Sequence, residues 1–196
     1  MYFGEPFGGL LPGARGAVLA VLLRTDTPLT GRQIHGLVRD RFSLSPVQDA
    51  LRNLNRLGIT ETRTVGRAGV HSINEHHYAV PHLRALVDPV AALRAVVDKA
   101  TRGVDSVILF GSIARGESTE TSDVDLAVIA PKGWDGHLRL EDAVRERLGN
   151  DCDVVVFTPA EFDALANSGE PVVHEILRDG VAVVGVKPPA GAGRSW

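Results

Sequence analysis

The second half of this 196-residue sequence holds a glycine-serine pair, Gly111-Ser112, and, after ten further residues, two aspartates, Asp123 and Asp125. A glycine lets a ligand approach the backbone closely, because it has no Cβ atom. The serine adds a hydroxyl and a backbone N–H that can hold phosphate oxygens, and Arg115 adds a bidentate charged donor. The pattern predicts a phosphate-binding corner beside a pair of carboxylates.

The two aspartates have the spacing of metal ligands on one strand. Side chains alternate along a strand, so Asp123 and Asp125 share a face while Val124 and Leu126 point into the core. Two carboxylates on one face of a strand repel each other, and a cation bound between them offsets that repulsion. Carboxylate oxygens suit Mg²⁺, with Mn²⁺ as a substitute. An Asp-x-Asp alone is more often a solvated strand edge, but its combination with the Gly-Ser corner is far more specific.

A third carboxylate is expected from the next strand, over residues 152–157. Asp153 lies within this β-branched run, and Asp151 just before it is the rival candidate. If the two strands are neighbours, Asp153 can join the aspartate pair as a metal ligand. It can also take the proton of an attacking hydroxyl.

These motifs resemble the nucleotidyltransferase superfamily related to the palm of DNA polymerase β, in its minimal bacterial and archaeal members. The resemblance rests on Gly111-Ser112, the ten-residue gap and Asp123-Val124-Asp125, and it covers roughly residues 83–186. It implies two Mg²⁺ ions and in-line attack on the α-phosphorus of a nucleoside triphosphate, with pyrophosphate leaving. Ile113 stands where many relatives carry Arg or Tyr, which leaves the core motif intact.

The resemblance also makes some kinds of acceptor plausible. The expected activity is transfer of a nucleoside monophosphate, AMP from ATP first, to a hydroxyl of a protein or an RNA. Small relatives are antitoxins that modify a toxin of the HEPN ribonuclease kind, which makes such a toxin an expected partner. A site that keeps the motif but binds nucleotide without turnover is the alternative.

The first part of the chain has a different pattern. Helices are expected over residues 14–25, 30–40 and 45–57, and Thr30 with Gln33 forms a capping-box pattern. Two strand-like runs follow, residues 59–65 and 70–80, joined by a glycine-containing turn. Three short helices and a hairpin resemble a winged helix-turn-helix domain.

In that comparison the third helix corresponds to a recognition helix, which reads base edges in the major groove of duplex DNA. The hairpin would meet phosphates. Winged helices also mediate protein contacts and dimerisation, which is the alternative role of this domain. The alternative for the whole chain is a DNA-binding transcription regulator whose nucleotidyltransferase domain binds nucleotide without turnover. A homodimer is expected in that case, because operators are two-fold sites. The expected DNA-binding residues are Gln48, Arg52, Asn53, Arg56, Arg63 and Arg67.

The elements of the second part alternate between helix and strand. A long helix is expected over residues 83–101, with an interruption at Pro89. Strands are expected over 106–110, 123–130, 152–157 and 181–186, and helices over 137–148, from Pro159 and over 171–178. The predicted fold is α/β (α+β) with a mixed sheet. We expect a winged helix-turn-helix domain over 1–80, a nucleotidyltransferase domain over 81–186 and a mobile tail over 187–196.

Composition limits the other function classes. A single cysteine, Cys152, excludes an intramolecular disulfide and a cysteine-based zinc site. No apolar run approaches the roughly 20 residues that span a bilayer, and the start lacks the pattern of a signal peptide. We therefore expect a cytoplasmic protein without a membrane partner. The net charge of −3 divides into +3 for residues 1–80 and −6 for residues 81–196, which suits two parts with different partners.

Overall fold

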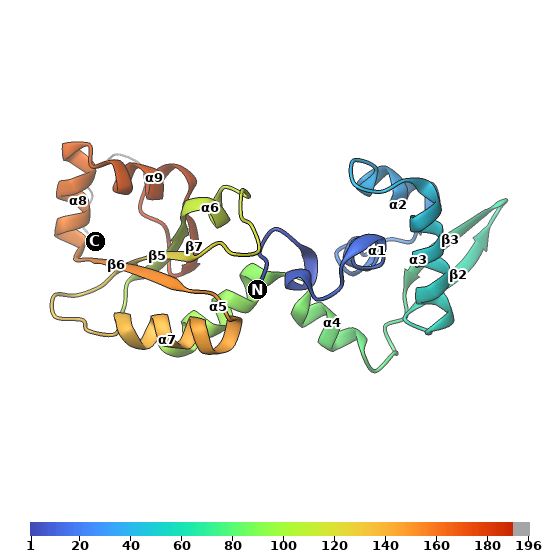
Figure 1. Ribbon diagram of the computed structural model, residues 1–196, viewed down its shortest axis with the longest axis horizontal. Helices are drawn as coiled ribbons and strands as arrows, with labels where there is room; N and C mark the ends of the chain where they lie inside the picture. The colour runs from blue at the N-terminus through green and yellow to red at the C-terminus, as the bar shows by residue number, and fades with distance from the viewer. Residues whose placement is uncertain (190–196) are drawn as a thin grey trace. The chain divides into compact units, whose positions relative to one another are not determined.

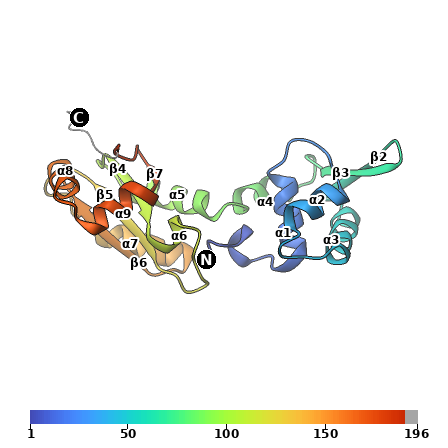
Figure 2. The same ribbon diagram turned by 90° about the horizontal axis from the view of Figure 1, so that it is seen from above.

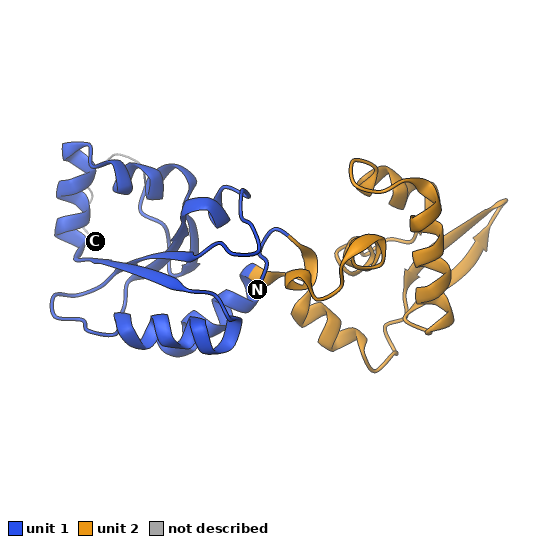
Figure 3. Ribbon diagram, viewed as in Figure 1, with its two compact units in different colours: residues 1–4, 90–196 blue, residues 5–89 orange. Residues whose placement is uncertain are grey.

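The structure is a computed structural model in which residues 1–189 are described. The chain forms two compact units, shown in different colours in Figure 3. In chain order we call residues 5–89, drawn in orange, the first unit, and residues 90–189 together with residues 1–4, drawn in blue, the second unit. The boundary predicted after residue 80 is therefore too early. Val80 and Val87 are buried in the core of the first unit, whereas Phe3 packs on the core of the second.

The first unit is built from helices followed by a β-hairpin (Figure 1). A short 3₁₀ helix and three α-helices come first, and their buried side chains, such as Leu19, Ile34 and Leu54, form one apolar cluster. Strand β3 pairs antiparallel with β2 and with the two-residue β1, so the sheet order is β1-β3-β2. The elements are η1 (Pro6–Gly9), α1 (Gly13–Leu23), β1 (Leu29–Thr30), α2 (Gly31–Val38), α3 (Leu44–Arg56), β2 (Thr60–Val65), β3 (Ala68–Ile73) and α4 (Val80–Leu86).

Local sequence explains most of these bounds. Helix α2 begins after Thr30, whose hydroxyl accepts a hydrogen bond from Gln33 N while the Gln33 side chain accepts from Thr30 N, as the capping box predicts. Strand β3 ends at Ile73, earlier than the predicted residue 80. The chain turns there because Asn74 Nδ2 donates to Gly58 O at 2.9 Å and His77 N donates to Asn74 O at 3.0 Å.

The second unit contains a four-stranded mixed sheet, as predicted (Figure 2). Its order is β6-β5-β4-β7, with β5 and β6 parallel and the other pairs antiparallel. The predicted interruption at Pro89 separates α4 from α5. The elements are α5 (Pro89–Ala100), β4 (Ser106–Phe110), α6 (Gly111–Ala114), β5 (Val124–Ile129), α7 (His137–Leu148), β6 (Cys152–Phe157), α8 (Pro159–Ser168), α9 (Pro171–Asp179) and β7 (Val181–Val184).

Apolar side chains cover both faces of this sheet. On one face, Leu126 and Val128 of β5 pack with Leu93 of α5 and with Leu140 and Val144 of α7. On the other face, the buried side chains come from alternate positions of β4 and β5 and from the last two helices: Ile108, Phe110, Ala127, Ile129, Phe162, Val173 and Ile176. A sheet between two helical layers holds its strands in fixed register.

The expectation of a mobile tail concerns residues 187–196, of which residues 190–196 lie outside the described part of the chain. Among residues 1–189, no helix is both long enough and apolar enough to cross a membrane.

Candidate functional site

Three predicted carboxylates lie near the starts of β5 and β6, where Asp153 and Asp123 both act electrostatically on Asp125. Asp125 and Asp153 are direct partners in the parallel pairing of these strands, so their side chains leave the sheet on the same face. Asp123 precedes Asp125 by two positions, and the intervening Val124 is fully buried on the opposite face. The register therefore brings Asp125 and Asp153 to one corner of the sheet, and Asp123, just before β5, is near enough to act on the charge of Asp125.

The carboxylates repel one another electrostatically. Burial raises the pKa of Asp125 above its usual value, and the negative charges of Asp153, Asp123 and Glu175 raise it further. Arg115 acts in the opposite direction and lowers this pKa. Asp125 is thus half-buried among like charges, an arrangement that a bound cation would relieve.

Gly111 closes the corner at the end of β4. Its φ of +69° lies in the left-handed region that favours glycine. A Cβ atom at this position would overlap the Asp125 carboxylate, lying 2.9 Å from Cγ and 3.3 Å from Cβ of that residue. Only a glycine lets the backbone turn into Ser112 and α6 while touching Asp125.

The loop that leads into Asp123 is anchored by hydrogen bonds. Asn150 is buried, and its Nδ2 donates to Ser122 O at 3.1 Å. Directly after Asp123, the backbone N–H of Val124 donates to Asp151 O at 2.9 Å. Sequence reasoning missed Asn150, because its partner lies 28 residues away and no spacing rule connects them.

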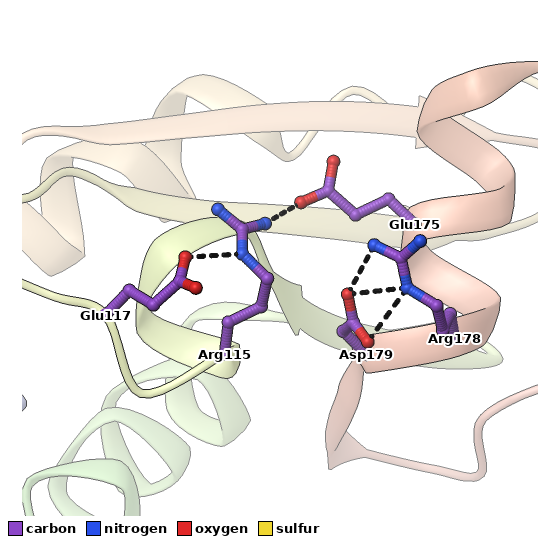
Figure 4. A network of polar contacts seen from close by, with 5 residues as sticks. All are labelled: Arg115, Glu117, Glu175, Arg178 and Asp179. Atoms are coloured by element: carbon purple, nitrogen blue, oxygen red, sulfur yellow. Dashed lines mark hydrogen bonds and ion pairs between the residues drawn. The ribbon is translucent and has the colours of Figure 1, made fainter.

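Arg115, predicted as a phosphate ligand, is held by two glutamates (Figure 4). Its Nε donates to Glu117 Oε2 at 2.8 Å, and its Nη1 forms an ion pair with Glu175 of α9. These hydrogen bonds, that of Glu117 first, raise the pKa of Arg115 above its already high value. Arg115 is therefore a fixed cation at the edge of the acidic corner.

This geometry agrees with a comparison against protein families. Residues 97–185 match the model of the family described as Polymerase beta, Nucleotidyltransferase. Residues 97–185 form a nucleotidyltransferase domain. The match runs from the end of α5 through β7, so the domain contains Gly111, Ser112 and all three aspartates of the corner.

Several solved structures contain a chain similar to this one, each aligned over half of this chain. A crystal structure of a toxin-antitoxin with AMP-PNP has 20% identity, a TM-score of 0.39 and 75% of its chain covered. A mutant of the toxin-antitoxin MntA-HpeT has 18% identity, a TM-score of 0.39 and 74% covered. A tri-AMPylated Shewanella oneidensis HEPN toxin in complex with MNT antitoxin has 18% identity, a TM-score of 0.35 and 70% covered. No curated protein sequence gives a significant match.

Within the nucleotidyltransferase domain, the two rival aspartates have different surroundings. Asp151 accepts a hydrogen bond from Arg145 Nε at 3.2 Å, and its side chain is 75% exposed. Asp153 is the residue that pairs in register with Asp125. The corner thus includes Asp153 and leaves Asp151 at its outer edge.

The carboxylate oxygens of the domain suit a hard cation such as Mg²⁺. Among residues 1–189, no group of three or more His, Cys, Asp or Glu side chains is gathered closely enough to hold a metal ion. Magnesium sites commonly use only one or two carboxylates, with substrate phosphates and water completing the shell. Asp125 and Asp153, as register partners on one face, meet that smaller requirement.

The residues predicted to bind DNA lie on α3 and the hairpin. Gln48 and Arg52 are exposed on α3 and line a cavity of about 540 Å³ together with Asn55, Thr62 and His71. Asn53 is half-buried instead, and its Oδ1 accepts from Arg56 Nη2 at 2.6 Å.

Other predicted positions of this unit also have acidic partners or line a second cavity. Arg63 forms an ion pair with Glu61 at 3.3 Å, and Arg52 forms one with Asp49. Arg67 lines a neighbouring cavity of about 640 Å³ with Arg32 and Gln48. The sequence missed Asn55, whose Nδ2 donates to Thr60 O at 3.1 Å and thereby ties α3 to β2.

Proposed function

We propose that the second unit is a metal-dependent nucleotidyltransferase that transfers a nucleoside monophosphate, AMP from ATP in the first instance, to a hydroxyl of a protein or RNA acceptor. The observation that carries this proposal is the register of Asp125 and Asp153 beside the Gly111 corner. The family match supports the reaction class.

Asp123, Asp125 and Asp153 are the residues that would hold the divalent ions. Mg²⁺, or Mn²⁺ in its place, would supply positive charge there to offset the negative charge of the triphosphate and of the reacting oxygens. Two ions suit three carboxylates, because each magnesium needs only one or two of them besides the phosphates. The repulsion that raises the pKa of Asp125 favours such loading.

The remaining residues bind and orient the nucleotide. Gly111 leaves space for the triphosphate to approach the backbone, and Ser112 offers its hydroxyl and N–H to phosphate oxygens. The acceptor hydroxyl oxygen forms a bond to the α-phosphorus, and the bond from that phosphorus to the bridging oxygen breaks. Pyrophosphate then leaves, and the hydroxyl proton passes to the Asp153 carboxylate.

A HEPN-type toxin is the first protein acceptor to test. This choice follows from the resemblance of the Gly111-Ser112 and Asp123-Val124-Asp125 motifs to those of small antitoxins. An RNA with free terminal hydroxyls is the corresponding nucleic-acid acceptor, because these hydroxyls suit the same chemistry.

The test is pyrophosphate release by the full chain with ATP and Mg²⁺, with each acceptor and without any. The double variant Asp123→Asn, Asp125→Asn should lose release, while Asp98→Asn, an exposed aspartate of α5, should retain it. Equal release from the double variant and the wild type would reject the proposal.

We propose a second function for residues 5–89, a winged helix-turn-helix that binds duplex DNA. Its support is the order of three helices and a hairpin, and the two cavities between α3 and the hairpin with Gln48, Arg52 and Arg67 in their walls. The charge of +3 over residues 1–80 has the sign that phosphate contacts need.

DNA binding also defines the alternative for the whole chain, a regulator that binds nucleotide without turnover. Arg52→Ala should weaken binding to an operator by about 1–3 kcal/mol if this arginine contacts a base. Operator binding together with nucleotide binding but no pyrophosphate release would favour the regulator over the enzyme.

A further inference from the structure

An arginine and a glutamate distant in sequence form an ion pair beside the carboxylates. Arg115 directly follows α6 as its C-cap, and its backbone N–H donates to Gly111 O at 3.2 Å. Glu175 lies on α9, 60 residues further on, and faces Arg115 in Figure 4. Because Gly111 touches Asp125, this turn of helix links the ion pair directly to the acidic corner.

The two glutamates that hold Arg115 are not equivalent. The side chains of Arg115 and Glu175 are 32% and 30% exposed, whereas that of Glu117 is 64% exposed. Glu117 follows Arg115 in the same loop, while Glu175 is presented by a helix whose Val173 and Ile176 are completely buried. Glu175 is therefore the rigid partner, and its contact is the less screened of the two.

The pairing leaves part of the guanidinium available. An arginine has five N–H donors, of which Nε serves Glu117 and Nη1 serves Glu175. Among residues 1–189, Nη2 has no partner. A phosphate oxygen can accept from this nitrogen without displacing either glutamate.

We propose that Glu175 is a positioning residue of the nucleotidyltransferase site, which holds the Arg115 guanidinium so that Nη2 meets the polyphosphate of the nucleoside triphosphate. The inference rests on the proposed function, whose substrate it concerns. Glu175 does not touch the reacting atoms. It restricts the long arginine side chain, which otherwise loses its freedom only when nucleotide binds.

The opposite role makes a different prediction. If Glu175 only neutralised Arg115, its removal would free the cation and strengthen nucleotide binding. If Glu175 positions Arg115, its removal weakens nucleotide binding, and a side chain that still accepts a hydrogen bond restores it. The two roles therefore differ in the sign of one measured change.

The experiment measures KM for ATP and kcat in the full chain. Glu175→Ala should raise KM by about 10-fold, the size typical of residues that orient a ligand, with a smaller change in kcat. Glu175→Gln should stay near the wild type, because its amide oxygen accepts the same hydrogen bond. Arg178→Gln, which breaks an arginine–carboxylate pair with Asp179 on the same helix, is the matched control and should leave KM unchanged.

A double variant separates positioning from general damage to α9. Arg115→Ala should raise KM at least as much as Glu175→Ala, and Arg115→Ala, Glu175→Ala together no more than Arg115→Ala alone. Effects that multiply, or an unchanged or lowered KM in Glu175→Ala, would overturn the inference. If the wild type releases no pyrophosphate, the proposed function fails, and the Kd of a non-hydrolysable ATP analogue in the same variants still decides the role of Glu175.

Discussion

The carboxylate of Asp125 occupies the space that a side chain at Gly111 would need. A Cβ atom at position 111 would lie 2.9 Å from Asp125 Cγ, and the backbone there has a φ of +69°. Gly111 is thus required both by its conformation and by its contact with the half-buried Asp125 carboxylate.

Gly111→Ala should abolish pyrophosphate release, because the added methyl displaces Asp125. Gly116→Ala is a matched control: its φ is +73°, but nothing lies within 4 Å of the added atom. Both changes should cost about 1–2 kcal/mol of stability from left-handed backbone strain. Release assays and thermal unfolding on both variants check this prediction, and comparable activity in the two would contradict it.

Asp153→Asn should reduce turnover by more than about 100-fold, the upper range for residues that merely support a metal ligand. Asp151→Asn should keep most of the activity, since Asp151 pairs with the exposed Arg145. The comparison uses steady-state kinetics at saturating Mg²⁺. A larger loss of turnover in Asp151→Asn than in Asp153→Asn would show that Asp151, and not Asp153, is the third carboxylate of the site.

Asn150→Ala should loosen the loop before Asp123. The variant loses the hydrogen bond to Ser122 O and the two that join the Asn150 side chain to the backbone N and O of Met1, each worth about 1 kcal/mol in folding. Hydrogen exchange should speed up around residues 118–124, and kcat should fall more than stability alone explains. Unchanged exchange in this loop would mean that Asn150 does not anchor it.

The thiol of Cys152 reports the register of β6. Cys152 is 4% exposed, and burial raises its pKa to about 12. Because the raised pKa keeps the thiol protonated, the native protein at pH 8 should react with thiol reagents far more slowly than the unfolded chain, and faster as pH rises. A one-residue slip would move Cys152 to the site face and Asp153 into the core. Rapid labelling of native protein would indicate such a slip.

Sequence patterns predicted those features of the two units that depend on neighbouring residues. Strand alternation placed Asp125 opposite the buried Val124 and Leu126, and the capping box at Thr30 set the start of α2. The β-branched run around Asp153 predicted β6. Each of these features follows from spacing of a few residues, for which periodicity is a direct signal.

Contacts between distant segments could not be predicted in the same way. Glu175 meets Arg115 across 60 residues, and Asn150 meets Ser122 across 28. On α3, Asn55 lines the cavity beside the hairpin, whereas the expected Asn53 does not. The first unit ends at residue 89 and not at the predicted residue 80, because Val80 and Val87 belong to its core. Composition does not reveal such tertiary packing.

The most direct test of nucleotidyl transfer compares ATP labelled at the α-phosphorus with ATP labelled at the γ-phosphorus. The full chain is incubated with each, together with Mg²⁺ and the acceptor, in parallel with Asp125→Asn. We predict that the wild type attaches the α-label to the acceptor and releases the γ-label as pyrophosphate. Asp125→Asn should neither label the acceptor nor release pyrophosphate. Release of the γ-label as orthophosphate, or attachment of the γ-label to the acceptor, would contradict the account.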